Sequence, residues 1–214
     1  SFAAEFIARA GVGKMTIVDG DTEDIANINR QLPALHSTVG LPKVDVVCDR
    51  LMDINPELQL TRIREFLSPE RAYELVSDEF DFVMDCIDSI TPKLNLIVAC
   101  KRKKVKVISS MGAGGKMLAS KVKVVDISKT ENCFFSATVK KRLRREYKIF
   151  DGIKVVFSSE PQDTSSLKLT DGSNFKKSFY GTNSYMRHRP PVRAPPRWPP
   201  LQQRSARGGR PHTA

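Results

Sequence analysis

The sequence predicts an α/β fold: a doubly wound, mostly parallel sheet with helices on both faces. Two observations lead to this prediction. Strand-like and helix-like segments alternate from residue 1 to about residue 160, and such alternation is typical of βαβ units. The apolar residues of each segment also repeat with the period of the structure that we assign to it. We therefore assign each segment from its period and from the residues at its ends.

The first half of this region contains two predicted helices and two predicted strands. Apolar residues recur at helical spacing in "FAAEFIARA" and stop at Gly11, which indicates a helix and its C-terminus. The next segment, "KMTIVD", predicts a strand that closes at Asp19. A second helix is predicted for "KVDVVCDRLMDINP", which ends at Pro56, and a second strand for "LQLTRI".

The second half continues the alternation. Ser68 and Pro69 begin a short predicted helix in "SPERAYELV". The apolar strand "FDFVMDCI" follows, and a longer helix starts near Thr91 and Pro92 and runs through "KLNLIVACKRKK". Two further strands are predicted for "VKVISSM" and "KVKVVDI", with the turn "GAGG" between them.

The chain divides at Glu160 into a predicted domain, residues 1–160, and a tail, residues 161–214. The tail is rich in Pro, Arg, Ser and Gly and almost lacks apolar periodicity, so it buries too little surface to offset the entropy of ordering and we expect it to be disordered. No Asp or Glu follows Asp171, and nine of the eleven net positive charges lie beyond it. The net charge of +11 is therefore weak evidence for a nucleic-acid partner.

Four cysteines, Cys48, Cys86, Cys100 and Cys133, never form a C-x-x-C pair. Their spacing argues against a zinc site or a redox dithiol and favours free thiols in a reducing compartment. Only Cys133 has loop-like neighbours, so it is the one candidate nucleophile, although no His lies near it in the sequence.

No apolar run reaches the roughly eighteen residues of a membrane-spanning helix, so we expect no integral membrane segment. The sequence itself indicates no compartment.

The stretch "DGDTEDIANINRQ" suits a nucleotide site. In doubly wound folds an acidic residue at a strand tip accepts hydrogen bonds from a ribose, and Asp19 has this position; a cap on a turn is its alternative role. Arg30 and Lys43 would supply positive charge to a triphosphate, or would lie on a solvated surface. Asn27 and Asn29 are equally typical of turns.

A second acidic pair lies in "MDCIDS", at the tip of an apolar strand. A carboxylate there suits Mg²⁺, and we prefer Asp88 to Asp85 because Asp88 lies further beyond the apolar run. The alternative role for Asp88 is a helix N-cap.

Three weaker patterns complete the candidates. The glycines of "GAGG" allow a close approach of the backbone to a ligand, or form a plain turn. The basic runs "KRKKVK" and "KKRLRR" are typical of solvated helix faces, or would neutralise the phosphates of a polynucleotide.

Taken in order, "DGDTEDIANINRQ", "VGLPKVDVV", "INPE", "DCIDSITPK" and "GAGG" resemble the ubiquitin-activating enzyme superfamily in its small, ThiF-type adenylyltransferase form. Within it, "NINRQLPAL", "MGAGGKM", "VVDISKT" and "VVFSSE" are similar to the tRNA threonylcarbamoyladenosine dehydratase branch. The resemblance covers about residues 1–160 and implies a Rossmann-like sheet.

The resemblance also implies roles for single residues. It makes Asp19 the ribose ligand, Asn27, Arg30 and Lys43 contacts to the phosphates, and Asp88 the carboxylate associated with Mg²⁺. The implied reaction uses ATP and Mg²⁺ to adenylylate the threonylcarbamoyl carboxylate on a tRNA adenosine, and an internal nucleophile then displaces AMP to give cyclic threonylcarbamoyladenosine. Implied partners are tRNA carrying threonylcarbamoyladenosine and a second copy in a homodimer. The location implied is cytoplasmic or organellar, with mitochondrial association in eukaryotic relatives.

Family members begin with a strand and a G-x-G-G-x-G-S loop, and Ser1 resembles the Ser that closes this loop. The resemblance therefore predicts a sheet that lacks its first, central strand and the Gly-rich loop. Beyond Glu160 the family continues into further elements, where this chain has its Pro/Arg-rich tail. Two other functions stay open: an activator of a ubiquitin-like or sulfur-carrier protein, and a non-catalytic tRNA-binding or dimerising remnant.

Overall fold

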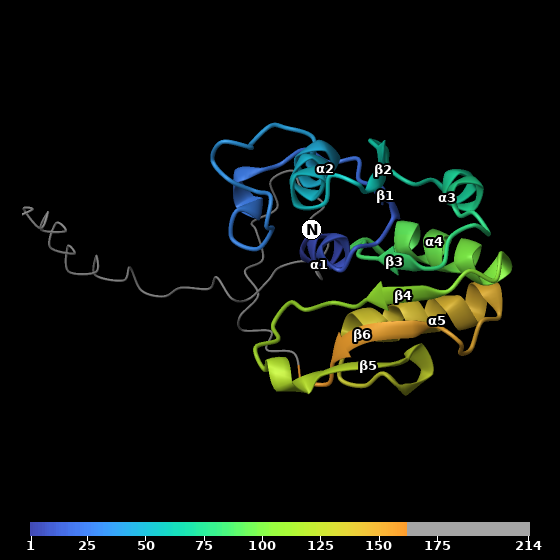
Figure 1. Ribbon diagram of the computed structural model, residues 1–214. Helices are drawn as coiled ribbons and strands as arrows, with labels where there is room; N and C mark the ends of the chain where they lie inside the picture. Colours follow the sequence, from blue (N-terminus) through green and yellow to red (C-terminus); the bar gives the residue numbers. More distant parts are fainter. Residues whose placement is uncertain (162–214) are drawn as a thin grey trace, which may run out of the picture.

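The alternation of strands and helices predicted from the sequence is present in the computed structural model, which describes residues 1–161 (Figure 1). The strands are β1 (Lys14–Val18), β2 (Gln59–Ile63), β3 (Val83–Asp85), β4 (Val107–Ser110), β5 (Val122–Asp126) and β6 (Lys154–Ser158). The α-helices are α1 (Phe2–Arg9), α2 (Lys43–Ile54), α3 (Pro69–Leu75), α4 (Ile90–Arg102) and α5 (Phe134–Tyr147). The predicted disorder of the tail concerns residues that, from 162 onward, lie outside the described part.

The described strands form two sheets. β1 pairs in parallel with β2, and the second sheet has the order β3-β4-β6-β5, in which only β5 is antiparallel to its neighbour. Figure 1 shows the strands one below another in the order β2, β1, β3, β4, β6, β5. The sheet is thus divided between β1 and β3, and no strand of the described residues lies between them. The prediction of an α/β fold with a mostly parallel sheet is confirmed.

The predicted start of α3 agrees with the structure because local capping sets it. The Ser68 hydroxyl accepts a hydrogen bond from the Arg71 backbone N–H at 3.1 Å, and Pro69 occupies the first turn of α3. β3 is shorter than predicted. A turn in which the Phe80 N–H donates to the Ser77 carbonyl precedes β3, and the chain bends again where Asp85 accepts from the Ile87 N–H at 3.0 Å.

The hydrophobic core has two separate parts, one for each sheet. Helix α4 lies against β3 and β4 and contacts α5, so both helices cover one face of the four-stranded sheet (Figure 1). The core beneath them includes Leu94, Ile97, Val139, Leu143, Val155 and Phe157. A smaller core forms where α1 and α2 pack with the first sheet, around Ala8, Leu51 and Leu58. The division of the sheet is therefore also a division of the core.

Helix lengths bear on the membrane prediction. Among residues 1–161, no helix combines the length and the apolar character that crossing a bilayer requires.

Candidate functional site

The first turn of α1 lies where the carboxyl ends of β1 and β3 approach each other. Loss of hydration raises the pKa of Asp19, Glu23 and Cys86, and all three lie close to Ser1, the N-cap of α1. Asp19 and Glu23 follow β1, whereas Cys86 follows β3. A helix N-terminus between two strand ends presents backbone N–H groups and a positive dipole end, which suits an anionic ligand such as a phosphate.

Asp19 directly follows β1, as predicted, and it caps a turn as well. Its Oδ1 accepts a hydrogen bond from the Asp21 N–H at 2.9 Å, while its own N–H donates to the Ile63 carbonyl at 3.1 Å. Its Oδ2 has no hydrogen-bond partner within residues 1–161. Burial raises the pKa of Asp19, and the neighbouring Lys43 ammonium opposes this. One oxygen thus holds the turn, and the other is available to a ligand.

Lys43 begins α2 and is held by a carboxylate. Its Nζ lies 2.9 Å from Asp21 Oδ2, and only 12% of its side chain is exposed. Its backbone N–H also donates to the Asp21 carbonyl at 3.0 Å. The sequence did not indicate this ion pair, which means that Asp21 has to release Lys43 before the ammonium can bind a phosphate.

Asn27 and Arg30 are neighbours in one loop, built on the short helix η1 (Ile25–Asn27). The Arg30 guanidinium donates to the Ala26 carbonyl at 2.7 Å, to Asn29 Oδ1 at 2.9 Å and to Asn27 Oδ1 at 3.3 Å. Since a guanidinium has five N–H donors, two of them remain for a ligand. The turn role that the sequence left open for Asn27 and Asn29 is present.

Glu23 is a residue that the sequence analysis missed. The Lys43 ammonium and the Asn27 side chain lower its pKa and Asp19 raises it, so all three lie near its carboxyl group. It is only 2% exposed, and neither carboxylate oxygen has a hydrogen-bond partner within residues 1–161. Burial, the largest influence, raises the pKa of Glu23. Nothing in the sequence pattern distinguishes it from its acidic neighbours.

The acidic pair after β3 separates into a buried and an exposed carboxylate. Asp85 is 1% exposed, and its Oδ2 accepts hydrogen bonds from Lys93 Nζ at 2.7 Å and from Ser109 Oγ at 2.5 Å. Lys93 is fully buried and also donates to the Ser110 carbonyl at 3.0 Å. Asp88 is exposed and accepts from Ser89 Oγ at 3.5 Å. The preference for Asp88 as the metal ligand stays a prediction.

Lys93 could have been found from the sequence. It lies one helical turn before Ile97 and beside Leu94, on the stripe that α4 buries. A cation on an apolar stripe requires a buried partner. Of the two acids that precede Lys93, Asp85 lies within the apolar strand pattern, so it is the one to expect as that partner.

The glycine-rich turn leads into a second buried lysine, Lys116, which is 7% exposed. Its Nζ donates to the carbonyls of Asn132 at 2.7 Å, of Ser158 at 3.1 Å and of Glu160. Burial lowers the pKa of Lys116, an effect opposed by Cys133 and Glu160. Lys116 therefore ties the "GAGG" turn to the end of β6.

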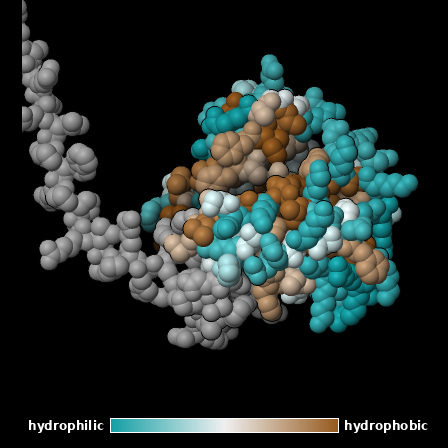
Figure 2. Space-filling view, turned by 90° about the horizontal axis from the view of Figure 1, so that it is seen from below, coloured by the Kyte–Doolittle hydropathy of each residue, from teal (hydrophilic) through white to brown (hydrophobic). Residues whose placement is uncertain are grey.

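The two basic runs lie at the amino ends of the parallel strands, whereas Asp19 lies at the carboxyl end of β1. α4 and α5 each precede a parallel strand, so their C-terminal ends lie at the amino ends of β4 and β6. Lys101 Nζ of the first run donates to the Gly152 carbonyl, just before β6, at 3.4 Å. Figure 2, the view from the β5 side, shows hydrophilic residues concentrated along one side of this face and apolar residues nearer its middle. Basic residues at helix C-termini also complement the helix dipoles.

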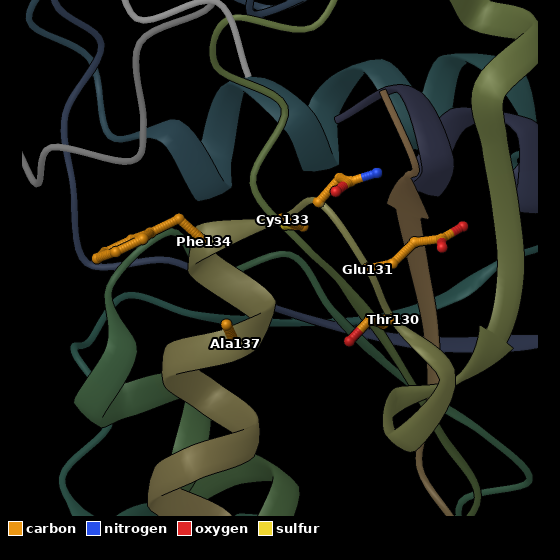
Figure 3. Close-up of a pocket in the computed structure, with 6 residues that line it drawn as sticks. Thr130, Glu131, Cys133, Phe134 and Ala137 are labelled. Carbon is orange, nitrogen blue, oxygen red and sulfur yellow. The ribbon is translucent and has the colours of Figure 1, made fainter. Parts of the chain in front are cut away.

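A pocket of about 370 Å³ lies at the start of α5 and is lined by Thr130, Glu131, Asn132, Cys133, Phe134 and Ala137. Figure 3 shows Glu131 and Phe134 extending in opposite directions from the turn, with Cys133 between them. Cys133 is 6% exposed, and its sulfur caps the helix by accepting from the Ser136 N–H at 3.5 Å. Of the candidates from the sequence, Cys133 lines this pocket, whereas Asp19, Asn27, Arg30, Lys43 and Asp88 do not.

Cys48 and Cys100, both buried, lack the properties of nucleophiles. Burial raises the pKa of Cys48 to about 11 and that of Cys100 to about 12, so both stay protonated at neutral pH.

The side chains that could act as metal ligands are scattered over the described residues. Within residues 1–161, no three His, Cys, Asp or Glu side chains are grouped so that they could hold an ion. Mg²⁺ commonly binds through one or two carboxylates together with the phosphates of a nucleotide. The exposed Asp88 fits that mode, in which the nucleotide supplies the other oxygen ligands.

These features are those of an α/β domain with an acid at a strand tip beside a helix N-terminus, an arrangement that suits a nucleotide. Comparison with known proteins is more specific: the chain belongs to the ThiF family, whose model matches residues 1–197.

The chain is similar to proteins named tRNA threonylcarbamoyladenosine dehydratase. It is 42% identical to the one from Bacillus subtilis over 75% of this chain and 63% of the relative. The identity to the Escherichia coli enzyme is 36%, over 75% of this chain and 62% of the relative. The chain thus spans less than two thirds of the length of these relatives. A molybdopterin-synthase adenylyltransferase of Escherichia coli is 36% identical over 50% of this chain and 43% of that protein.

Solved structures agree with the sequence comparison. The crystal structure of the Escherichia coli tRNA N6-threonylcarbamoyladenosine dehydratase in complex with ATP matches with a TM-score of 0.73 and 35% identity, over 75% of this chain and 69% of that chain. The structure of the same enzyme in complex with AMP matches with the same TM-score and identity.

Proposed function

We propose that this chain uses ATP to adenylylate the threonylcarbamoyl carboxylate on a tRNA adenosine, which leads to cyclic threonylcarbamoyladenosine. The observation that supports this most strongly is the position of Asp19, at a strand tip beside the first turn of α1, within a chain 42% identical to a tRNA threonylcarbamoyladenosine dehydratase. The dehydratase of Escherichia coli has been crystallised with ATP and with AMP, the substrate and a product of such a reaction.

The reaction asks the protein for positioning and for neutralisation of charge. A carboxylate oxygen attacks the α-phosphorus of ATP, and the bond from that phosphorus to the pyrophosphate oxygen breaks. In the second step an internal nucleophile attacks the activated carbonyl carbon, the ring closes, and AMP leaves with the bonding electrons. Since both steps spread negative charge over phosphate oxygens, fixed donors stabilise them.

Each candidate residue has a part in this scheme. Asp19 accepts a hydrogen bond from a ribose hydroxyl through Oδ2, the oxygen that does not bind the Asp21 N–H. Arg30 offers its two remaining N–H donors to the phosphates while Asn27 keeps the guanidinium in place. Lys43 adds positive charge after Asp21 releases it. Asp88 would hold Mg²⁺, which neutralises phosphate charge when it is bound.

The further partners follow from the same proposal. We expect tRNA carrying threonylcarbamoyladenosine as the substrate and a homodimer as the assembly. The basic runs at the ends of α4 and α5 offer charge to the tRNA backbone away from the nucleotide site.

ATP–pyrophosphate exchange tests the proposal. The full chain with Mg²⁺ should exchange pyrophosphate only when tRNA carrying threonylcarbamoyladenosine is present, and mass spectrometry of the digested tRNA should show a nucleoside that has lost one water. Arg30→Ala and Asp88→Asn should each lower the exchange rate by about tenfold to a hundredfold, because each removes a charge-assisted contact of roughly 1.5–3 kcal/mol.

Matched changes away from the site are the controls. Lys14→Ala and Asp53→Asn alter exposed charges elsewhere and should leave the rate unchanged. Exchange that requires a carrier protein ending in Gly-Gly, and not tRNA, would replace this proposal with carrier activation. Absence of exchange with either partner would exclude adenylylation by this chain.

A further inference from the structure

The carboxyl group of Glu23 is the feature that the proposed mechanism does not use. We propose that Glu23 binds the nucleoside half of the nucleotide, where its carboxyl group accepts a hydrogen bond from an uncharged N–H or O–H donor. The inference rests on the proposed function, which supplies the nucleotide.

The burial of Glu23 without a partner indicates that a ligand group is missing. The side chain is 2% exposed, and within residues 1–161 it is the only side chain with buried oxygen or nitrogen atoms that lack a hydrogen-bond partner. Buried polar groups in folded proteins nearly always find partners, since an unpaired group loses its hydration without compensation. Lys93 and Lys116 are as deeply buried, and each donates three hydrogen bonds.

The backbone holds Glu23 in place from both sides. Its N–H donates to the Leu41 carbonyl at 2.8 Å, and its carbonyl accepts from the Gly40 N–H at 2.8 Å. The neighbouring residue Thr22 forms a bridge with Pro42, directly before α2. This double attachment fixes the backbone on which the buried carboxyl group is carried, as a pre-organised binding group requires.

The charges around Glu23 select the kind of ligand group. The negative charge of Asp19 acts on Glu23, and the nearby Lys43 ammonium is already paired with Asp21. A phosphate would therefore be repelled at Glu23. A metal held by protein groups alone is disfavoured, because no three His, Cys, Asp or Glu side chains are grouped among residues 1–161, and the phosphates that could complete an Mg²⁺ site are repelled at Glu23.

What remains is an uncharged donor close to the ribose position at Asp19. The nucleoside of ATP has three donor groups: the 2′-hydroxyl, the 3′-hydroxyl and the adenine amino group. Each of the three can donate a hydrogen bond to a carboxylate. Nucleotide analogues that lack one of these groups show which of them Glu23 binds.

Equilibrium binding of ATP and three analogues to the full chain tests the proposal. The analogues are 2′-deoxy-ATP, 3′-deoxy-ATP and purine riboside triphosphate, which lacks the amino group. The wild-type chain should bind one of them about tenfold more weakly than ATP, and Glu23→Leu should bind ATP about tenfold more weakly and lose the preference against that analogue alone. Glu23→Gln, which keeps an acceptor, should restore part of the preference.

Glu57→Leu is the matched control, because Glu57 is exposed in the turn between α2 and β2, and it should leave every ratio unchanged. Circular dichroism shows that each variant is folded before binding is measured. If all ratios of ATP to analogue affinity are the same in Glu23→Leu and in the wild type, the role of Glu23 is excluded while ATP binding stands. If the wild-type chain binds no nucleotide, the proposed function fails and this inference fails with it.

Discussion

Asp85 and Glu23 are both buried carboxylates that lie near the carboxyl ends of strands, one in each half of the molecule. Asp85 is 1% exposed and accepts hydrogen bonds from Lys93, Ser109 and the Ile87 backbone. Glu23 is 2% exposed and accepts none within residues 1–161. In the sequence the two residues look alike, because each is an acid near the end of an apolar strand.

The comparison separates structural acids from acids that await a ligand. A buried carboxylate whose partners are all protein groups stabilises the fold and has no acceptor left for a ligand. Removing one of its partners leaves the carboxylate charge uncompensated. A buried acid without partners destabilises the free protein and gains when a donor arrives. Three predictions test this difference, in order of expected effect.

Lys93→Met should destabilise the protein by about 3–5 kcal/mol, the cost of leaving a buried partner charge unpaired. Asp85 would keep only Ser109 and the Ile87 N–H. Urea denaturation followed by circular dichroism measures the change in the free energy of unfolding. Lys141→Met, on the exposed side of α5, is the control and should stay within about 0.5 kcal/mol. A loss below about 1 kcal/mol for Lys93→Met would show that the pair matters little to the fold.

Ser109→Ala should have a smaller effect, a loss of about 1–2 kcal/mol, because Asp85 keeps Lys93 as its charged partner. The same denaturation experiment measures it. In the double variant with Lys93→Met, the two losses should differ from their sum, since both residues bind the same carboxylate oxygen. Strict additivity would contradict the description of this cluster as one network.

Glu23→Gln should change how stability depends on pH. Burial raises the pKa of Glu23 above its ordinary value of 4.5, so the folded chain binds more protons than the unfolded chain above that pH. The contribution of Glu23 to the free energy of unfolding therefore falls as pH rises from about 4.5 through the folded-state pKa. Without nucleotide, the stability of the variant relative to the wild type should therefore increase as pH rises above about 4.5.

Asp19, whose pKa is also raised by burial, is present in both proteins, so comparison of the two stability curves isolates Glu23. Parallel curves across this pH range would mean that Glu23 titrates alike in the folded and unfolded states. That result would remove the contrast with Asp85.

Much of the fold could be predicted because periodicity and local caps determine it. The helix at residues 43–54 follows from its apolar face, and α3 follows from Ser68 and Pro69. The division of the core between two sheets could not be predicted from periodicity, because a strand pattern does not say which neighbour the strand pairs with. The resemblance to the family did predict where the sheet lacks a strand.

The candidate site was predictable in its positions but not in its contacts. Asp19 lies at the predicted strand tip, yet nothing in the sequence indicates that Asp21 pairs with Lys43 across α2's start. Arg30 binds its own loop, which is a matter of side-chain geometry. Glu23 was missed because burial of a loop residue depends on packing by segments distant in sequence, here residues 40–42.

The divided core also affects how the protein opens. Since each sheet has its own apolar cluster, the two halves are separate cooperative units, and the smaller one can unfold locally while the larger stays intact. Asp19 and Glu23 belong to the smaller unit and Asp88 to the larger. A nucleotide that contacts both would link the two opening equilibria, so that occupancy of the site makes the domain unfold as one.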